Sequence, residues 1–331
     1  MKKLLNAPEN YVDEMLEGLV AAHPETYRLH AHRVVVRAGD KRPGKVGIVS
    51  GGGSGHLPVF TGYVGRGLLD GCAIGNVFAS PSADQMAETI RAVDAGAGVL
   101  CLYGNYGGDV MNFDMASETV GFEDDIRTAS VVLADDVVSA PAAEREKRRG
   151  VGGMVYGYKI AGAAAEAMAD LDEVTRIAQK AADAVVSIGM AMTPCIIPQV
   201  GKPTFTIAED EMEMGMGIHG EPGIRREKLR TADEIADEMF ETLQADRPLG
   251  AGDRVSVLVN SLGATPLEEL YILYRRLAPK VADLGAEIVM PLVGRYATSM
   301  EMTGATVSII RLDDELETLL RAPADCAFWK V

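Results

Sequence analysis

Short runs of β-branched and other apolar residues alternate along this chain with longer stretches in which apolar positions recur at helical spacing. This alternation is typical of βα units that build a mostly parallel sheet. In the first half it predicts strands over His32–Arg37, Lys45–Ser50, Asp70–Ile74, Gly98–Tyr103 and Ala129–Ala134. It predicts helices over Ser82–Ala95 and Asp109–Glu118, and serine is a frequent N-cap residue.

The alanine-rich stretch Gly152–Ile188 has few helix breakers, and we expect two helices there, separated near residues 170–172. A second series then predicts strands Arg254–Asn260, Ala286–Met290 and Thr306–Arg311, and helices Thr265–Ala278 and Asp313–Arg321. Between the two series lies Met192–Arg226, which is rich in Pro, Gly and Met. We therefore predict an α/β protein of two domains, residues 1–185 and 186–331, each a mostly parallel or mixed sheet flanked by helices.

Composition and charge limit the kinds of partner. The longest apolar runs are far shorter than the ~20 residues of a membrane-spanning helix, and the first residues lack the apolar core of a signal peptide. We therefore expect a soluble, cytoplasmic protein that does not bind membranes. The formal net charge is −16, whereas nucleic-acid binding needs a basic surface, so nucleic acid is not an expected partner.

The four cysteines are far apart in the sequence and form no Cys-x-x-Cys pair. They are Cys72, Cys101, Cys195 and Cys326. This spacing is typical neither of a disulfide framework nor of a zinc site, so we interpret them as buried apolar residues and expect no metal in this chain.

His56 lies in a glycine-dense loop, Ser50–Pro58, that follows a predicted apolar strand. Such loops at the carboxyl ends of parallel strands are where α/β proteins bind ligands, and glycine lets backbone N–H groups approach a ligand closely. The loop matches neither the Walker A motif nor the dinucleotide-binding fingerprint. A tight structural turn explains the glycines alone equally well, whereas the embedded histidine favours a functional loop.

Asp109 follows another predicted strand, in the segment Gly104–Phe113. In the first turn of the next helix it has two interpretations: a helix cap, or a carboxylate that binds a sugar hydroxyl and accepts its proton. The third candidate is His219, whose neighbouring glycines in Met214–Gly223 expose the imidazole to a ligand. The alternative for His219 is a mobile turn. The methionines of this region (Met212, Met214 and Met216) fit either core packing or a soft pocket wall.

Three segments, in this order, resemble the dihydroxyacetone kinase K subunit family. They are Gly-Gly-Gly-Ser-Gly-His at 51–56, Asn-Tyr-Gly-Gly-Asp-Val-Met-Asn-Phe at 105–113 and Gly-Ile-His-Gly-Glu-Pro-Gly at 217–223. The resemblance runs nearly end to end and includes residues 10–23, 260–274 and 293–302. It implies a homodimer of two-domain α/β protomers that binds a small ketose and presents its terminal hydroxyl for phosphorylation.

The resemblance also implies a role for each candidate. His219 matches the histidine that forms a covalent hemiaminal with the ketose carbonyl carbon, and His56 matches a residue that hydrogen-bonds the substrate and is proposed as a proton acceptor. Asp109 matches the carboxylate that binds and activates the terminal hydroxyl. The expected substrate-binding positions are Gly53, Ser54, Gly55, His56, Gly104 and Asp109.

In the family, the nucleotide belongs to another subunit or domain. The resemblance implies no cofactor and no metal in this chain, and it places ATP and magnesium, or a permanently bound ADP, on a separate L subunit. A phosphotransferase-system protein is the phosphoryl donor in the ADP-containing case. We therefore expect an L-type partner that acts in trans.

Two positions depart from the family pattern. Leu57 stands where members typically have Glu, and Gly104 stands where they usually have a lysine that contacts the substrate. Loss of a long cation at position 104 enlarges the pocket, which leads to the hypothesis that the substrate is a larger ketose, for example the tetrulose erythrulose.

Two other functions compete with this interpretation. A K-like ketose sensor that acts as a transcriptional coactivator needs the tether alone, so the presence of His56 and Asp109 together with His219 favours catalysis. A self-contained nucleotide enzyme would use the loop 51–55 as a phosphate cradle. No lysine follows that loop and no acidic pair marks a magnesium site, which disfavours it. We interpret the pair Arg148 and Arg149 as a solvated basic edge.

Overall fold

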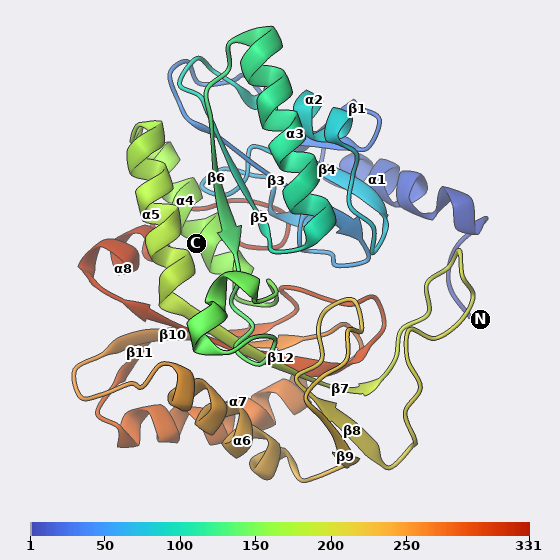
Figure 1. The fold of residues 1–331 in the computed structure, drawn as a ribbon, viewed down its shortest axis with the longest axis vertical. Helices are drawn as coiled ribbons and strands as arrows, with labels where there is room; N and C mark the ends of the chain where they lie inside the picture. The colour runs from blue at the N-terminus through green and yellow to red at the C-terminus, as the bar shows by residue number, and fades with distance from the viewer. Residues whose placement is uncertain (1) are drawn as a thin grey trace. The chain divides into compact units, whose positions relative to one another are not determined.

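A computed structural model describes residues 2–331 as two compact units, each with a six-stranded sheet and its own helices (Figure 1). Unit 1 contains the described residues up to Leu133, together with Tyr156–Ala182 and Leu316–Val331. Unit 2 contains Ala134–Val155 and Asp183–Glu315. The predicted fold class, two α/β sheets flanked by helices, is confirmed.

Both units are discontinuous in the sequence. A single boundary after residue 185 leaves Ala134–Val155 with the first series of elements and Leu316–Val331 with the second. Internal contacts group each of these segments with the other unit. These contacts define compact bodies, not segments that fold alone, so the boundary between residues 185 and 186 stays a prediction.

The sheet of unit 1 has the strand order β1-β2-β4-β3-β5-β6. The strands are β1 Tyr27–Ala31, β2 Val34–Arg37, β3 Gly47–Ser54, β4 Gly71–Val77, β5 Val99–Gly104 and β6 Thr128–Leu133. Strand β3 pairs in parallel with β4 and β5, and β5 pairs in parallel with β6, while β1 and β2 form an antiparallel edge. The carboxyl ends of β3, β4 and β5 therefore share one edge of the sheet.

Helices cover both faces of this sheet. The helices that lie wholly or mainly in unit 1 are α1 Tyr11–Ala22, α2 Ala83–Val93, α3 Gly107–Asp124, α4 Met154–Glu166, α5 Leu171–Ala184 and α8 Asp314–Arg321, with short 3-10 turns at Pro8–Asn10 and Thr61–Tyr63. Ser50 and Gly51 are successive residues of β3 and so face opposite sides. Ser50 shares a 3.2 Å hydrogen bond with Tyr158 of α4, whereas the ring of Phe113 in α3 lies against Gly51. Figure 1 shows α2 and α3 on the same side of the sheet.

Unit 2 has the strand order β11-β10-β12-β7-β8-β9. The strands are β7 Val185–Thr193, β8 Glu211–Met214, β9 Arg225–Lys228, β10 Arg254–Ser261, β11 Glu287–Gly294 and β12 Thr303–Leu312; the helices are α6 Ala232–Asp246 and α7 Leu267–Asp283, with a 3-10 turn at Ala142–Lys147. All neighbours are antiparallel except β10 and β11. Helices α6 and α7 lie side by side against one face (Figure 1). Their apolar residues, with those of the sheet, form the core.

The predicted elements are present with shifted ends, and Ser82 does cap α2 through a capping box with Gln85. The helical interpretation of Gly152–Ile188 was wrong at its end, because β7 begins at Val185 without a polar or glycine break. Strands β8 and β9 were not predicted, since each has only four residues, of which two in β8 and all four in β9 are charged. Among residues 2–331, no helix combines the length and the apolar character needed to cross a bilayer.

Candidate functional site

The candidate residues are distributed over both units. Unit 1 holds His56, Asp109 and the loop positions Gly53, Ser54, Gly55 and Gly104, and unit 2 holds His219. In unit 1, Ser54 is the last residue of β3 and Gly104 the last of β5, and both are buried at the carboxyl edge of the sheet.

The glycines of the first loop are required by the packing of unit 1 itself. A Cβ atom on Gly52 would lie 2.1 Å from the ring of Phe60, and one on Gly53 would lie 2.6 Å from the backbone nitrogen of Ala79. Gly55 has φ 104°, a left-handed conformation that favours glycine. The structural explanation of this loop therefore accounts for Gly52, Gly53 and Gly55, whatever the loop also binds.

Replacing Gly53 with alanine is expected to destabilise the protein by about 1–3 kcal/mol, because the new methyl group meets backbone atoms that cannot rotate away. The matched control is Gly107→Ala, where nothing lies within 4 Å of the new Cβ, and helix propensity favours alanine by up to ~1 kcal/mol. Thermal unfolding checks both. A Gly53→Ala protein that melts at or above the wild-type temperature would contradict the packing argument.

His56 is fully buried between two aromatic rings. Its ring stacks on Phe78, with centroids 4.8 Å apart, and it meets the edge of Phe60 at 6.0 Å. Phe78 follows β4, so the stack joins the loops after β3 and β4. Phe78 was not among the predicted site residues. Its position just beyond a predicted strand was the available signal, but the contact with His56 depends on the pairing of two strands that are distant in the chain.

Asp109 lies in the first turn of α3 and is 4 % exposed. The N-cap of this helix is Tyr106, so Asp109 is not the cap, although the helix amino terminus still stabilises its negative charge. Asp109 precedes Phe113 by one turn on the same helix face, and Phe113 packs on Gly51 of β3. Asp109 therefore faces the carboxyl edge of β3. Burial raises the pKa of the Cys72 thiol on β4, and the charge of Asp109 acts in the same direction.

The segment after β4 connects the two candidate loops of unit 1. Phe78 contacts His56 at one end of this segment. Two residues later, the hydroxyl oxygen of Ser80 would lie 2.6 Å from a Cβ atom on Gly108, which adjoins Asp109. The structure thus brings the His56 loop and the Asp109 turn to one sheet edge, and it adds Phe78 and Ser80 to the residues that line it.

In unit 2, His219 lies in the loop between β8 and β9, and its side chain is 19 % exposed. Glu221 holds it at two points: a carboxylate oxygen lies 2.9 Å from Nδ1, and the backbone N–H of His219 donates to the other oxygen at 2.9 Å. An ionised carboxylate accepts hydrogen bonds and does not donate them, so Nδ1 carries the proton in the neutral ring. The lone pair is then on Nε2, which makes this atom the nucleophile of the imidazole.

The ionised state of Glu221 follows from its surroundings. Burial acts to raise the pKa of Glu221, but the hydrogen bond from His219, together with the positive charge of that ring when it is protonated, outweighs burial and lowers the pKa to about 2. Because this pKa is lower in the folded than in the unfolded chain, the resulting stabilisation is present above about pH 4.5 and is lost as the pH falls towards 2.

We expect Glu221→Gln to remove part of the acid sensitivity of folding. The free energy of unfolding of the wild-type protein should fall between about pH 4.5 and 2 by at most ~3 kcal/mol through this group, and the variant should lose that contribution. Urea unfolding at pH 5, 4 and 3 measures it. Glu241→Gln, an exposed substitution on α6, is the matched control. Identical pH profiles for the two variants would refute the assignment.

Arg149 supports the His219 loop. It donates to the backbone carbonyl of Gly215 at 3.0 Å and to the buried carboxylate of Asp136 at 2.7 Å. A Cβ atom on Gly217 would lie 2.8 Å from the Arg149 guanidinium and 2.2 Å from the Glu221 carboxylate, so a larger residue here would displace the side chains that hold the His219 loop. The supporting roles of Arg149 and Glu221 were not predicted, because nothing in the motif indicates where their side chains point.

The interpretation of Arg148 and Arg149 as a solvated basic edge was wrong. Arg148 is 1 % exposed and donates to both carboxylate oxygens of Asp246, at 3.0 and 2.5 Å. Arg149 is held by Asp136. Both guanidiniums are therefore neutralised inside unit 2. The methionines of the loop region (Met212, Met214 and Met216) are buried, which favours core packing over a pocket wall.

Known proteins resemble the chain over its whole length. A 45% identical relative, covering 99% of this chain and 100% of the relative, is the dihydroxyacetone-binding subunit of PTS-dependent dihydroxyacetone kinase 1 of Listeria innocua. An L-erythrulose kinase of Pectobacterium atrosepticum is 44% identical over 98% of this chain, which spans 55% of that enzyme.

Solved structures lead to the same family. The dihydroxyacetone kinase of C. freundii matches 99% of this chain with a TM-score of 0.86 and 31% identity, over 60% of its own length. A dihydroxyacetone kinase operon co-activator matches 94% of this chain with a TM-score of 0.87 and 32% identity. The Dak1 domain model matches residues 17–328. With the predicted motifs in place, the chain therefore belongs to the Dak1 domain family, alongside the K subunits of dihydroxyacetone kinases.

Proposed function

We propose that this chain is the ketose-binding subunit of a ketose kinase and that it binds its substrate as a hemiaminal on His219. The observation that carries the proposal is the His219–Glu221 pair, which fixes the proton on Nδ1 and leaves a lone pair on Nε2. The full-length similarity to a dihydroxyacetone-binding subunit supports the choice of ligand.

The covalent step follows from this tautomer. Nε2 attacks the ketose carbonyl carbon, a carbon–nitrogen bond forms, and the electron pair of the carbonyl double bond moves to oxygen. The oxygen takes up a proton while the ring gives up the proton of Nδ1, so the hemiaminal forms with no net change in protons. Glu221 stabilises the positive charge that develops on the ring before that proton leaves. Glycerol has no carbonyl group and is not captured.

The residues of unit 1 act on the captured sugar in this proposal. Asp109 binds the terminal hydroxyl and accepts its proton as the oxygen attacks the phosphoryl group. His56 hydrogen-bonds the substrate, with Gly53, Ser54, Gly55 and Gly104 as neighbouring contacts. The tether raises the effective concentration of a sugar that is too small to bind tightly by contacts alone.

The phosphoryl donor is assigned to a partner. We propose an L-type subunit that carries ATP and magnesium, or a bound ADP that a phosphotransferase-system protein recharges, and we assign no cofactor to this chain. The names of several relatives support a PTS- or PEP-dependent donor. A cytoplasmic homodimer completes the proposal, on the resemblance to K subunits alone.

The ketose is proposed to be larger than dihydroxyacetone. Leu57 and Gly104 replace two polar residues of the family pattern, and Gly104 is the last residue of β5, just before α3, which begins at Gly107 and carries Asp109 in its first turn. Relatives of similar identity include erythrulose kinases as well as dihydroxyacetone-binding subunits.

Intact-protein mass spectrometry tests the capture. Incubation with dihydroxyacetone or erythrulose is expected to add the mass of one ketose per chain, and glycerol is expected to add none. Turnover of the two ketoses with an added L subunit then ranks them. A strong preference for dihydroxyacetone would refute the larger-ketose assignment, and the absence of an adduct with either sugar would refute the tether.

A second candidate function is a ketose sensor that acts as a transcriptional coactivator. The structural match to a dihydroxyacetone kinase operon co-activator favours it. A sensor is expected to form the adduct but to yield no phosphorylated ketose with any competent L subunit. Phosphoryl transfer to a ketose therefore separates the two functions.

A further inference from the structure

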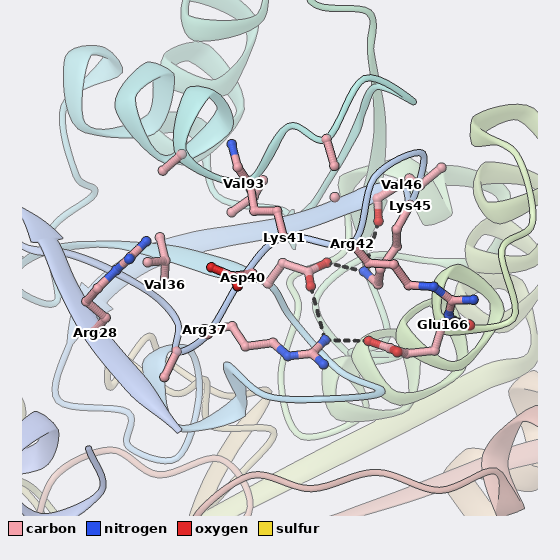
Figure 2. Close-up of a pocket in the computed structure, with 16 residues that line it drawn as sticks. Arg28, Val36, Arg37, Asp40, Lys41, Arg42, Lys45, Val46, Val93 and Glu166 are labelled. Atoms are coloured by element: carbon pink, nitrogen blue, oxygen red, sulfur yellow. Dashed lines mark hydrogen bonds and ion pairs between the residues drawn. The ribbon is translucent and has the colours of Figure 1, made fainter. Parts of the chain in front are cut away.

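Unit 1 contains a second concave site, at the opposite end of β3 from the candidate ketose loops. It is lined by the loop that leads into β3 and by residues of β1, β2 and α4, including Arg28, Arg37, Lys41, Arg42 and Glu166 (Figure 2). Strand β3 has eight residues, so about 25 Å of extended chain separates the two ends. This pocket is therefore distinct from the edge that holds His56 and Asp109.

The floor of the pocket is a chain of three successive ion pairs. Lys45 donates to Asp70 at 2.6 Å, Asp70 lies 3.5 Å from Arg37, and Arg37 donates to Glu166 (Figure 2). Burial acts to raise the pKa of Glu166, but Arg37 outweighs burial and lowers it, so the carboxylate stays ionised. Two cations and two carboxylates neutralise each other here, and the floor contributes no net charge.

The rim carries the excess of positive charge. Arg28 extends from β1, while Lys41 and Arg42 belong to the loop between β2 and β3. Lys41 and Arg42 donate to backbone carbonyls, of Asp94 at 2.8 Å and of Glu166 at 3.1 Å, and none of the three cations forms an ion pair among residues 2–331. Asp40 is the one carboxylate of the rim. The pocket as a whole has two more cations than carboxylates, in a chain with a net charge of −16.

Backbone donors add to the side chains. In the described part of the chain, no hydrogen bond is donated by the N–H groups of residues 39–42, which form the loop at the rim. Gly39 has φ 88°, and successive N–H groups around a left-handed residue form the concave nests that bind anions. The loop thus offers neutral donors beside three cations.

We propose that this pocket binds a phosphate group, either inorganic phosphate or the phosphate of a small monoester. Arginine forks match tetrahedral oxyanions, and a phosphate near neutral pH has charge and acceptors for donors from several directions. The cavity volume of about 80 Å³ is large enough to hold one such group.

Isothermal titration calorimetry of the full chain tests the site, with inorganic phosphate and methyl phosphate as probes and sodium chloride at matched ionic strength as the reference. The two probes distinguish the free ion from the ester. The key variant is the double substitution Arg28→Gln and Arg42→Gln, with Lys41→Gln as an independent second variant. The matched control, Arg275→Gln with Arg321→Gln, removes two exposed arginines elsewhere on the surface.

Saturable binding with a dissociation constant below about 10 mM is expected for at least one probe, weakened about tenfold or more by the Arg28/Arg42 variant and by Lys41→Gln about threefold. The control should keep the wild-type affinity. Binding should persist in saturating dihydroxyacetone, because the ketose loops of unit 1 lie at the other end of β3. Heats that match sodium chloride, or affinities that neither rim variant changes, would overturn the proposal.

Discussion

His219→Ala is expected to eliminate the ketose adduct and to lower kcat/KM for ketose phosphorylation by at least about a thousandfold. The expected loss is large because the imidazole is the proposed nucleophile, and an oriented covalent tether contributes effective concentrations of about 10⁵ M or more. Mass spectrometry after incubation with a ketose measures the adduct. Steady-state assays with an added L subunit measure the phosphorylation.

His32→Ala is the matched control, since His32 is an exposed histidine outside the candidate loops. It should keep both the adduct and the activity. Glu221→Gln should keep the nucleophile but lose the charge that fixes its tautomer, so adduct formation should slow without disappearing. A ketose adduct on the His219→Ala protein would show that another group captures the sugar.

Asp109→Asn is expected to lower kcat by about a hundredfold to ten-thousandfold while the adduct still forms, because it removes the proposed general base and leaves the tether intact. The substitution preserves shape, so it tests the charge of a residue that is 4 % exposed at the first turn of α3. The same two assays separate the effects: the adduct by mass, the turnover by product formation.

Asp84→Asn provides the comparison for that result. Asp84 is also an acidic residue in the first turn of a helix, α2, but it is exposed and lies outside the candidate loops. It should change kcat little. If Asp109→Asn loses the adduct together with the activity, then Asp109 acts in binding or folding, and the general-base assignment fails.

The sequence predicts the candidate site in unit 1 well where the signals are local. His56 and Asp109 each lie a few residues after an apolar strand, and the parallel pairing of β3, β4 and β5 brings the carboxyl ends of these strands to one edge. The stack of Phe78 on His56 was not predictable in this way, because it joins loops after two different strands. Its geometry depends on strand order, which the hydrophobic pattern does not determine.

The supporting residues of the third loop escaped prediction for a different reason. Glu221 is only two residues from His219 in the sequence. Yet only the folded turn shows that its carboxylate reaches back to the backbone N–H and to Nδ1 of His219. Arg149 is about seventy residues away in the sequence and reaches Gly215 through the fold of unit 2. The charge of Arg149 led to the prediction of a surface position. The sequence does not show that the buried carboxylate of Asp136 accepts a hydrogen bond from the Arg149 guanidinium.

The two hydrogen bonds between Glu221 and His219 have an evolutionary consequence. Both hydrogen bonds lie within three consecutive residues, so one short loop holds the proton on Nδ1 of the proposed nucleophile. Under the proposed function, positions such as Leu57 and Gly104 can then diverge among paralogues while this loop is kept. The choice of sugar and the chemistry of its capture would then be inherited separately, and new substrates would arise by changing the first alone.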